Sequence, residues 1–161
     1  MTGENIGGVY FFHPAQSVAR SEFIAMASAA AELPLEPTVH TDFVDDSGLS
    51  DWAKPFVSTA AANGLVSGYQ TASGLAESRG QNPITLAEAS VIVNNVLHGA
   101  SGDTQYVLAG EHSADMDWAQ SAVSSLTRLD VLSPVAAMRG ADEPITRQTA
   151  CEMIYNTMQL L

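Results

Sequence analysis

The chain has 161 residues, the length of one ordinary domain or of a few small units that share a core. Its 18 acidic residues outnumber its six lysines and arginines, and the net charge of −12 disfavours nucleic acids and anionic membrane surfaces as partners. No segment is long and apolar enough to insert into a bilayer. The single cysteine, Cys151, excludes an internal disulfide and a cysteine-based metal site.

The first predicted element is a helix that follows an irregular loop at 7–14. It begins within the segment Ser-Val-Ala-Arg-Ser-Glu-Phe at 17–23. Its apolar positions recur at spacings of three and four, which predicts one buried face. They are Phe23, Met26, Ala27, Ala30 and Ala31.

An acidic run at 42–46 comes next and suggests a calcium site. The spacing of an EF-hand loop fails, because the glycine at 48 would place Phe43 in the first ligand position. A solvated turn is the favoured interpretation. The four histidines also lack metal-ligand spacing. We therefore expect neither a metal nor another cofactor.

A short helix is predicted at 51–62, which opens with Asp-Trp-Ala. Asp51 stands where an N-cap is expected, and Pro55 falls in the first turn, where a missing N–H costs little. Gly64 and Gly68 most simply end this helix and turn the chain. The following stretch, 67–83, is rich in Gly, Ser, Asn and Pro and is expected to be irregular.

A third helix begins in Pro-Ile-Thr-Leu-Ala-Glu-Ala at 83–89. Its apolar positions share the register of the first long helix. They are Ala89, Ile92, Val93, Val96 and Leu97.

The last part of the chain repeats both kinds of helix. Asp-Trp-Ala recurs at 117–119, 66 positions after the first copy, with Asp117 at the expected N-cap, and Pro-Ile-Thr recurs at 144–146. The final helix carries the same stripe at Ala150, Met153, Ile154, Thr157 and Met158. Three helices with one apolar phase are best buried against one another.

The repeating unit is thus a short helix, a loop and a longer helix. We divide the chain into a partial first repeat at 1–38, a full second repeat at 39–101 and a degenerate third repeat at 102–161, which together form one compact module. No Asp-Trp-Ala helix stands in the first repeat. We therefore expect the chain to be part of a longer secreted protein, with an apolar N-terminal edge where the missing helix would pack.

The order Phe43-x-Asp45, Trp52-Ala53, Gly64-Leu65-Val66-x-Gly68-Tyr69 and Ile84-Thr85-x-Ala87-Glu88 resembles the S-layer homology domain, across nearly all of 7–161. The resemblance implies an all-α, pseudo-threefold module with a central three-helix bundle and short helical prongs. It also implies non-catalytic attachment of a larger protein to bacterial cell-wall polysaccharide (the secondary cell wall polymer) at the extracellular surface.

The family ends each repeat with a Thr-Arg-Ala-Glu signature. The three versions here are Ala19-Arg20-Ser21-Glu22, Thr85-Leu86-Ala87-Glu88 and Thr146-Arg147-Gln148-Thr149, so none is complete. A guanidinium can grip an acidic sugar through two parallel hydrogen bonds. The residues expected to bind glycan are Arg20, Glu22, Trp52, Gly68, Thr85, Glu88, Trp118, Thr146 and Arg147.

Structural interpretations stay open for several of these residues. Thr85 and Glu88 have the spacing of a capping box, and Trp52 and Trp118 can pack at the base of a prong or stack on a sugar. No nucleophile or phosphate-binding motif is present, so an enzyme is not expected. The alternative function is a scaffold that has lost glycan binding and serves protein contacts or self-association through the N-terminal edge.

Overall fold

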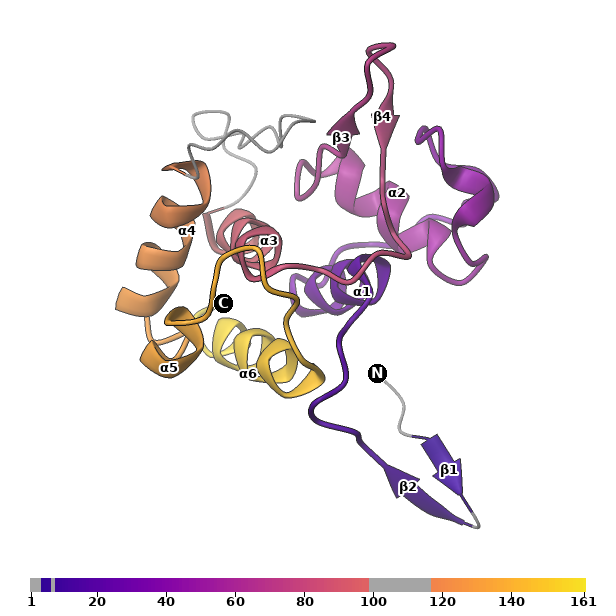
Figure 1. Cartoon of the computed structure of the whole chain (residues 1–161). Coiled ribbons are helices and arrows are strands. Elements are labelled where there is room, and N and C mark those ends of the chain that lie inside the picture. Colours follow the sequence, from indigo (N-terminus) through magenta and orange to yellow (C-terminus); the bar gives the residue numbers. More distant parts are fainter. Residues whose placement is uncertain (1–3, 7, 99–116) are drawn as a thin grey trace.

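The structure, a computed structural model, describes residues 4–6, 8–98 and 117–161, and is mostly helical (Figure 1). Its helices are α1 (Arg20–Ala30), α2 (Lys54–Ala62), α3 (Leu86–His98), α4 (Asp117–Arg128), α5 (Pro134–Ala137) and α6 (Arg147–Met158), with a 3-10 turn at Asp46–Gly48. Two antiparallel hairpins pair β1 (Glu4–Ile6) with β2 (Val9–Phe11), and β3 (Tyr69–Gln70) with β4 (Ala76–Glu77).

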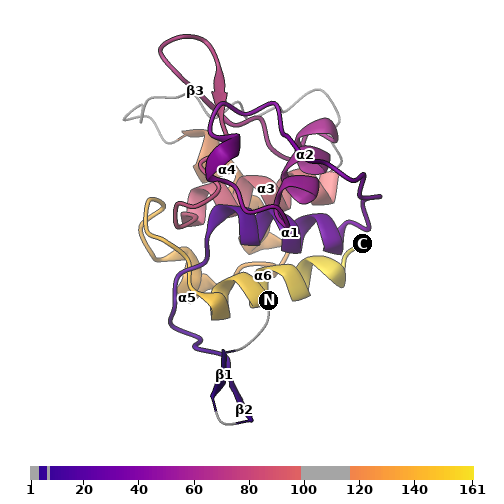
Figure 2. The same cartoon turned by 90° about the vertical axis from the view of Figure 1, so that its right-hand side faces the viewer.

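The hairpins differ from the irregular loops expected at 7–14 and 67–83. They project from opposite ends of the molecule (Figure 2). In the second hairpin, the hydroxyl of Thr71 accepts from the N–H of Leu75 and donates to its carbonyl, and Gly74 has φ +79°. These strands are too short to show the alternation by which a strand is recognised in a sequence.

The three long helices α1, α3 and α6 contact one another pairwise and hold the core between them. The stripe predicted from the sequence supplies that core, because most of its members are buried. Fully buried members include Phe23, Ala27, Ala89, Val93, Ala150 and Met153.

A closed ring of backbone hydrogen bonds joins the three segments that lead into the long helices. The N–H of Ile84 donates to the carbonyl of Val18 (2.9 Å), that of Ile145 to Ile84 (2.9 Å), and that of Val18 to Ile145 (3.3 Å). All three side chains are buried. Each segment therefore donates to one neighbour and accepts from the other.

Each short helix packs on the long helix that precedes it in the chain: α2 on α1, and α4 on α3. The expected N-caps were wrong. Asp51 lies ahead of α2, in a tight turn where the N–H groups of Ala53 and Lys54 donate to the carbonyl of Ser50. Asp117 is itself a residue of α4 and therefore does not cap it. Pro55 does lie in the first turn of α2, as expected.

The described helices are all too short or too polar to cross a membrane.

Candidate functional site

The starts of the long helices carry the signature residues, and their first role is capping. The N–H of Thr85 donates to Oε2 of Glu88 (2.8 Å), and the N–H of Glu88 donates to Oγ1 of Thr85 (3.3 Å), which is a complete capping box. Glu22 and Thr146 each make half of this arrangement, with Ala19 and Thr149 respectively. The structural interpretation of Thr85 and Glu88 is therefore confirmed.

Arg20 lies inside the module, with only 1% of its surface exposed. Its Nε donates to the carbonyl of Ser78 (3.1 Å), and its Nη1 lies 3.8 Å from Oε1 of Glu88. Among the described residues, Nη1 has no hydrogen-bond partner. Burial lowers the pKa of the guanidinium, Glu88 opposes that shift, and the nearby Arg79 adds to it. This arginine is thus a buried cation held mainly by Ser78 and Glu88.

Tyr69 is flanked by two guanidinium groups. The Cζ atom of Arg79 lies 4.1 Å from the centre of its ring and that of Arg20 lies 5.2 Å away, both within cation–π range. Nε of Arg79 also donates to Oε2 of Glu77 (3.1 Å), and both of these side chains are 34% exposed. We call Arg20, Tyr69, Glu77 and Arg79 the Tyr69 cluster, and Arg79 and Glu77 form its surface.

The backbone around this cluster is held by an aspartate and a glycine. The carboxylate of Asp45 accepts from the N–H and hydroxyl of Ser78 and from the N–H of Arg79, at 2.7–3.0 Å. Gly68 has φ +72°, and a Cβ there would lie 2.5 Å from Cε1 of Phe43. Gly68 therefore permits close packing under the hairpin.

The other acids of the run at 42–46 differ in role. Oδ1 of Asp46 accepts from the N–H of Thr41 (2.6 Å), and Oδ2 accepts from the buried Nζ of Lys54 (2.9 Å). The Thr41 N–H, followed by Lys54, lowers the pKa of Asp46 far below its usual range. Asp42 is exposed. The expected solvated turn thus describes Asp42, whereas Asp45 and Asp46 fix the loop.

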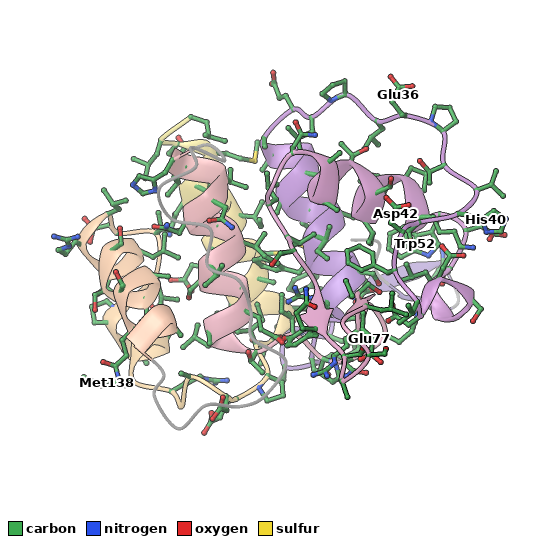
Figure 3. All side chains as sticks on the ribbon, turned by 90° about the horizontal axis from the view of Figure 1, so that it is seen from above. Glu36, His40, Asp42, Trp52, Glu77 and Met138 are labelled. Carbon is green, nitrogen blue, oxygen red and sulfur yellow. The ribbon has the colours of Figure 1, made fainter. Side chains whose placement is uncertain are left out.

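An open groove of about 690 Å³ lies between α1, α2 and α6, and we call it the α1–α6 groove. Its walls are mainly apolar. They consist of Glu22, Ala25, Met26, Ala29, Ala30, Trp52, Phe56, Ile154 and Met158. Trp52 is 53% exposed and packs edge-to-face against Phe56, with 6.3 Å between ring centres. Figure 3 shows Trp52 on the same side of the molecule as His40 and Asp42.

The structure distributes the residues predicted to bind glycan over three places. Arg20, Gly68, Thr85 and Glu88 lie in or beneath the Tyr69 cluster. Glu22 and Trp52 line the α1–α6 groove. The third place is the start of α6. There Thr146 caps the helix, and Cζ of Arg147 lies 5.3 Å from the centre of the Phe12 ring. The side chain of Trp118 lies outside the described residues.

The sequence prediction missed Arg79 and did not assign Tyr69 to the site. Arg79 has a left-handed backbone, with φ +50°, and His13, at the equivalent position 66 residues earlier, has φ +52°. The available signal was the shift of 66 residues between repeats, because it pairs these two polar residues, each of which lies two positions after the second strand of its hairpin.

Comparison with known proteins supports the family resemblance. Residues 42–72 match the family model of the S-layer homology domain, and this segment contains Trp52, α2, Gly68 and Tyr69. No curated protein matches the chain. The matched segment therefore supports an S-layer homology domain in this chain.

Proposed function

We propose that the chain is a non-catalytic module that attaches a larger protein to a polysaccharide of the bacterial cell wall, outside the cell. S-layer homology domains are generally cell-wall anchoring modules, associated with the cell surface. The observation that carries the proposal is the Tyr69 cluster, which presents a positioned arginine on a strongly acidic chain.

The chemistry of the Tyr69 cluster suits a sugar or an acidic substituent on one. The guanidinium of Arg79 lies over the Tyr69 ring and is bonded by Glu77, so its remaining N–H groups have a restricted direction. A preorganised guanidinium loses less freedom when it binds a carboxylate or a pair of hydroxyls. Glu77 supplies acceptors beside it. Arg20, from beneath, adds positive potential without reaching the surface.

The net charge of −12 acts against an anionic polymer at long range. At contact range, the two arginines near Tyr69 oppose this repulsion. We therefore expect binding to an acidic wall polymer to strengthen between very low salt and about 0.1 M salt, where the long-range field is screened over about 10 Å.

We also infer that the three repeats are arranged about a pseudo-threefold axis. The cyclic hydrogen bonds among Val18, Ile84 and Ile145 support this arrangement. A second cyclic layer runs in the reverse direction: the N–H groups of Arg20, Leu86 and Arg147 donate to the carbonyls of Asn82, Glu143 and Gln16.

The test is co-sedimentation of the chain with purified wall sacculi, before and after the secondary polymers are stripped. The native chain should sediment with intact walls only. Arg79→Gln should weaken binding by about tenfold or more, because one charged hydrogen bond contributes about 1.5–3 kcal/mol.

Arg139→Gln is the matched control, since Arg139 is an exposed arginine that does not belong to the Tyr69 cluster. It should change binding less than twofold. Arg20→Ala is unsuitable as a binding test, because removing a buried cation also disturbs the fold. Equal binding by all variants, or no sedimentation of the native chain, would overturn the proposal.

A further inference from the structure

We propose that the α1–α6 groove is a docking site for a short amphipathic helix of a partner polypeptide, whose apolar stripe resembles that of α2 and α4. The repeated pattern of packing indicates which kind of element would occupy the groove. α1 is covered by α2 and α3 by α4, whereas α6 has no such cover among the described residues.

Equivalent positions on α1 and α6 show the effect of a covering helix. Ser28 on α1 is fully buried, and its equivalent on α6, Tyr155, is 64% exposed. Ala31 on α1 is half-buried, and its equivalent on α6, Met158, is 55% exposed. The side of the helix that is buried in α1 is therefore exposed in α6.

The chemistry of the groove suits a helix better than a sugar. Trp52 and Phe56 form one wall and Ile154 and Met158 the other, and among the described residues Glu22 is the one charged residue that lines the groove. An exposed apolar surface on so acidic a chain marks an interaction site. Helix-in-groove recognition uses such a surface, with anchors at spacings of three and four. The stripe Ala53, Val57, Ala60 of α2 has this spacing and is fully buried against α1.

One contact distinguishes this groove from the two that are filled. Nδ2 of Asn95 donates to the carbonyl of Leu65 (3.1 Å), just after α2, and Nδ2 of Asn156 donates to that of Val131 (3.3 Å), just after α4. The equivalent residue on α1 is Ala29, which lines the groove. A helix docked there receives no hydrogen bond from an asparagine amide at this position, so the burial of apolar side chains holds it. Its binding should therefore depend little on salt.

The test uses the full chain and a fluorescein-labelled peptide of residues 48–66, which carries the α2 stripe. Fluorescence anisotropy should show saturable binding, with a dissociation constant that changes less than twofold between about 0.05 and 0.5 M salt. An electrostatic contact would weaken over this range, because the screening length falls about threefold. A peptide with Val57→Asp and Ala60→Asp should not bind.

Met158→Glu places a charge in the groove at an exposed position and should weaken peptide binding by about tenfold or more. Met138→Glu is the matched control, because Met138 is 85% exposed and lies away from the groove (Figure 3). Met158→Lys should weaken binding as Met158→Glu does, which separates loss of apolar contact from charge repulsion. Circular dichroism verifies that the variants are folded.

The proposal is overturned if both peptides bind alike, or if Met158→Glu binds like Met138→Glu. It is also overturned if the peptide fails to bind while the chain forms a dimer that Met158→Glu dissociates, because the occupant is then a second copy. Wall sedimentation of Met158→Glu should equal that of the native chain, so this proposal and the wall-anchoring function fail independently.

Discussion

Arg20 begins α1 and Glu88 lies in the first turn of α3, 68 residues later, yet their Nη1 and Oε1 atoms lie 3.8 Å apart beneath the surface of the module. The ring of backbone bonds brings the starts of α1 and α3 together, so the arginine of one signature meets the glutamate of the next. Glu88 uses its other oxygen to cap its own helix through the N–H of Thr85. One carboxylate therefore links local and long-range structure.

This double role predicts unequal costs for two conservative changes. Thr85→Ala should lower the free energy of unfolding by about 1 kcal/mol, the usual cost of a lost cap. Glu88→Gln retains an acceptor for the Thr85 N–H but leaves the buried Arg20 without its counter-charge, and should cost about 2 kcal/mol. Urea unfolding monitored by circular dichroism measures both. Equal costs would mean that the ion pair adds nothing.

Gly68 and Gly64 provide a matched pair of glycine substitutions. Both have φ +72°, so alanine at either position should cost about 1 kcal/mol from backbone strain. At Gly68 the new Cβ also meets Cε1 of Phe43 at 2.5 Å and the carbonyl of Glu77 at 2.8 Å. We expect Gly68→Ala to be clearly more destabilising than Gly64→Ala in thermal unfolding. Similar melting temperatures would show that the hairpin moves aside easily.

The ends of α1 and α4 allow the reverse substitution, in which glycine replaces a residue with a left-handed backbone. Glu32 and Asp130 have φ +51° and +55° just after these helices, the place that Gly64 takes after α2. In each case the next N–H closes the turn onto a helix carbonyl, as in Leu33 to Ser28 and Val131 to Leu126. Asp130→Gly and Glu32→Gly should each stabilise the fold by about 0.5–1 kcal/mol. A loss of stability in denaturant titrations would contradict this reasoning.

Asp46 predicts how stability depends on pH. Its pKa is lower in the folded chain than the ordinary value of 3.8, so its ionised form stabilises the fold at neutral pH. That contribution is complete above pH 3.8 and is lost as the pH falls through and below this value. Asp46→Asn removes the titrating group, so the difference in stability between wild type and variant should shrink between pH 5 and 3. A constant difference over this range would show that the charge of Asp46 is not what stabilises the loop.

Part of this structure could be predicted from local pattern. The stripes of α1, α3 and α6 follow from helical spacing, and the Thr85–Glu88 box from its own four residues. Contacts between repeats could not be predicted in this way. The burial of Arg20 depends on Ser78 and Glu88, which the fold brings from the next repeat. The surface of the Tyr69 cluster depends on a left-handed backbone at Arg79 itself, although a glycine, Gly80, is the next residue.

The closed hydrogen-bond ring of Val18, Ile84 and Ile145 also fixes the number of repeats. A linear stack of repeats has two free ends and can gain or lose a unit, with each end covered by a cap. A ring has no end at which a unit can be added. Removing one repeat leaves a donor and an acceptor unsatisfied on the remaining two. Changes in the loops and prongs of such a module leave this ring intact, whereas a fourth unit could be added only by breaking the ring or by building a second one.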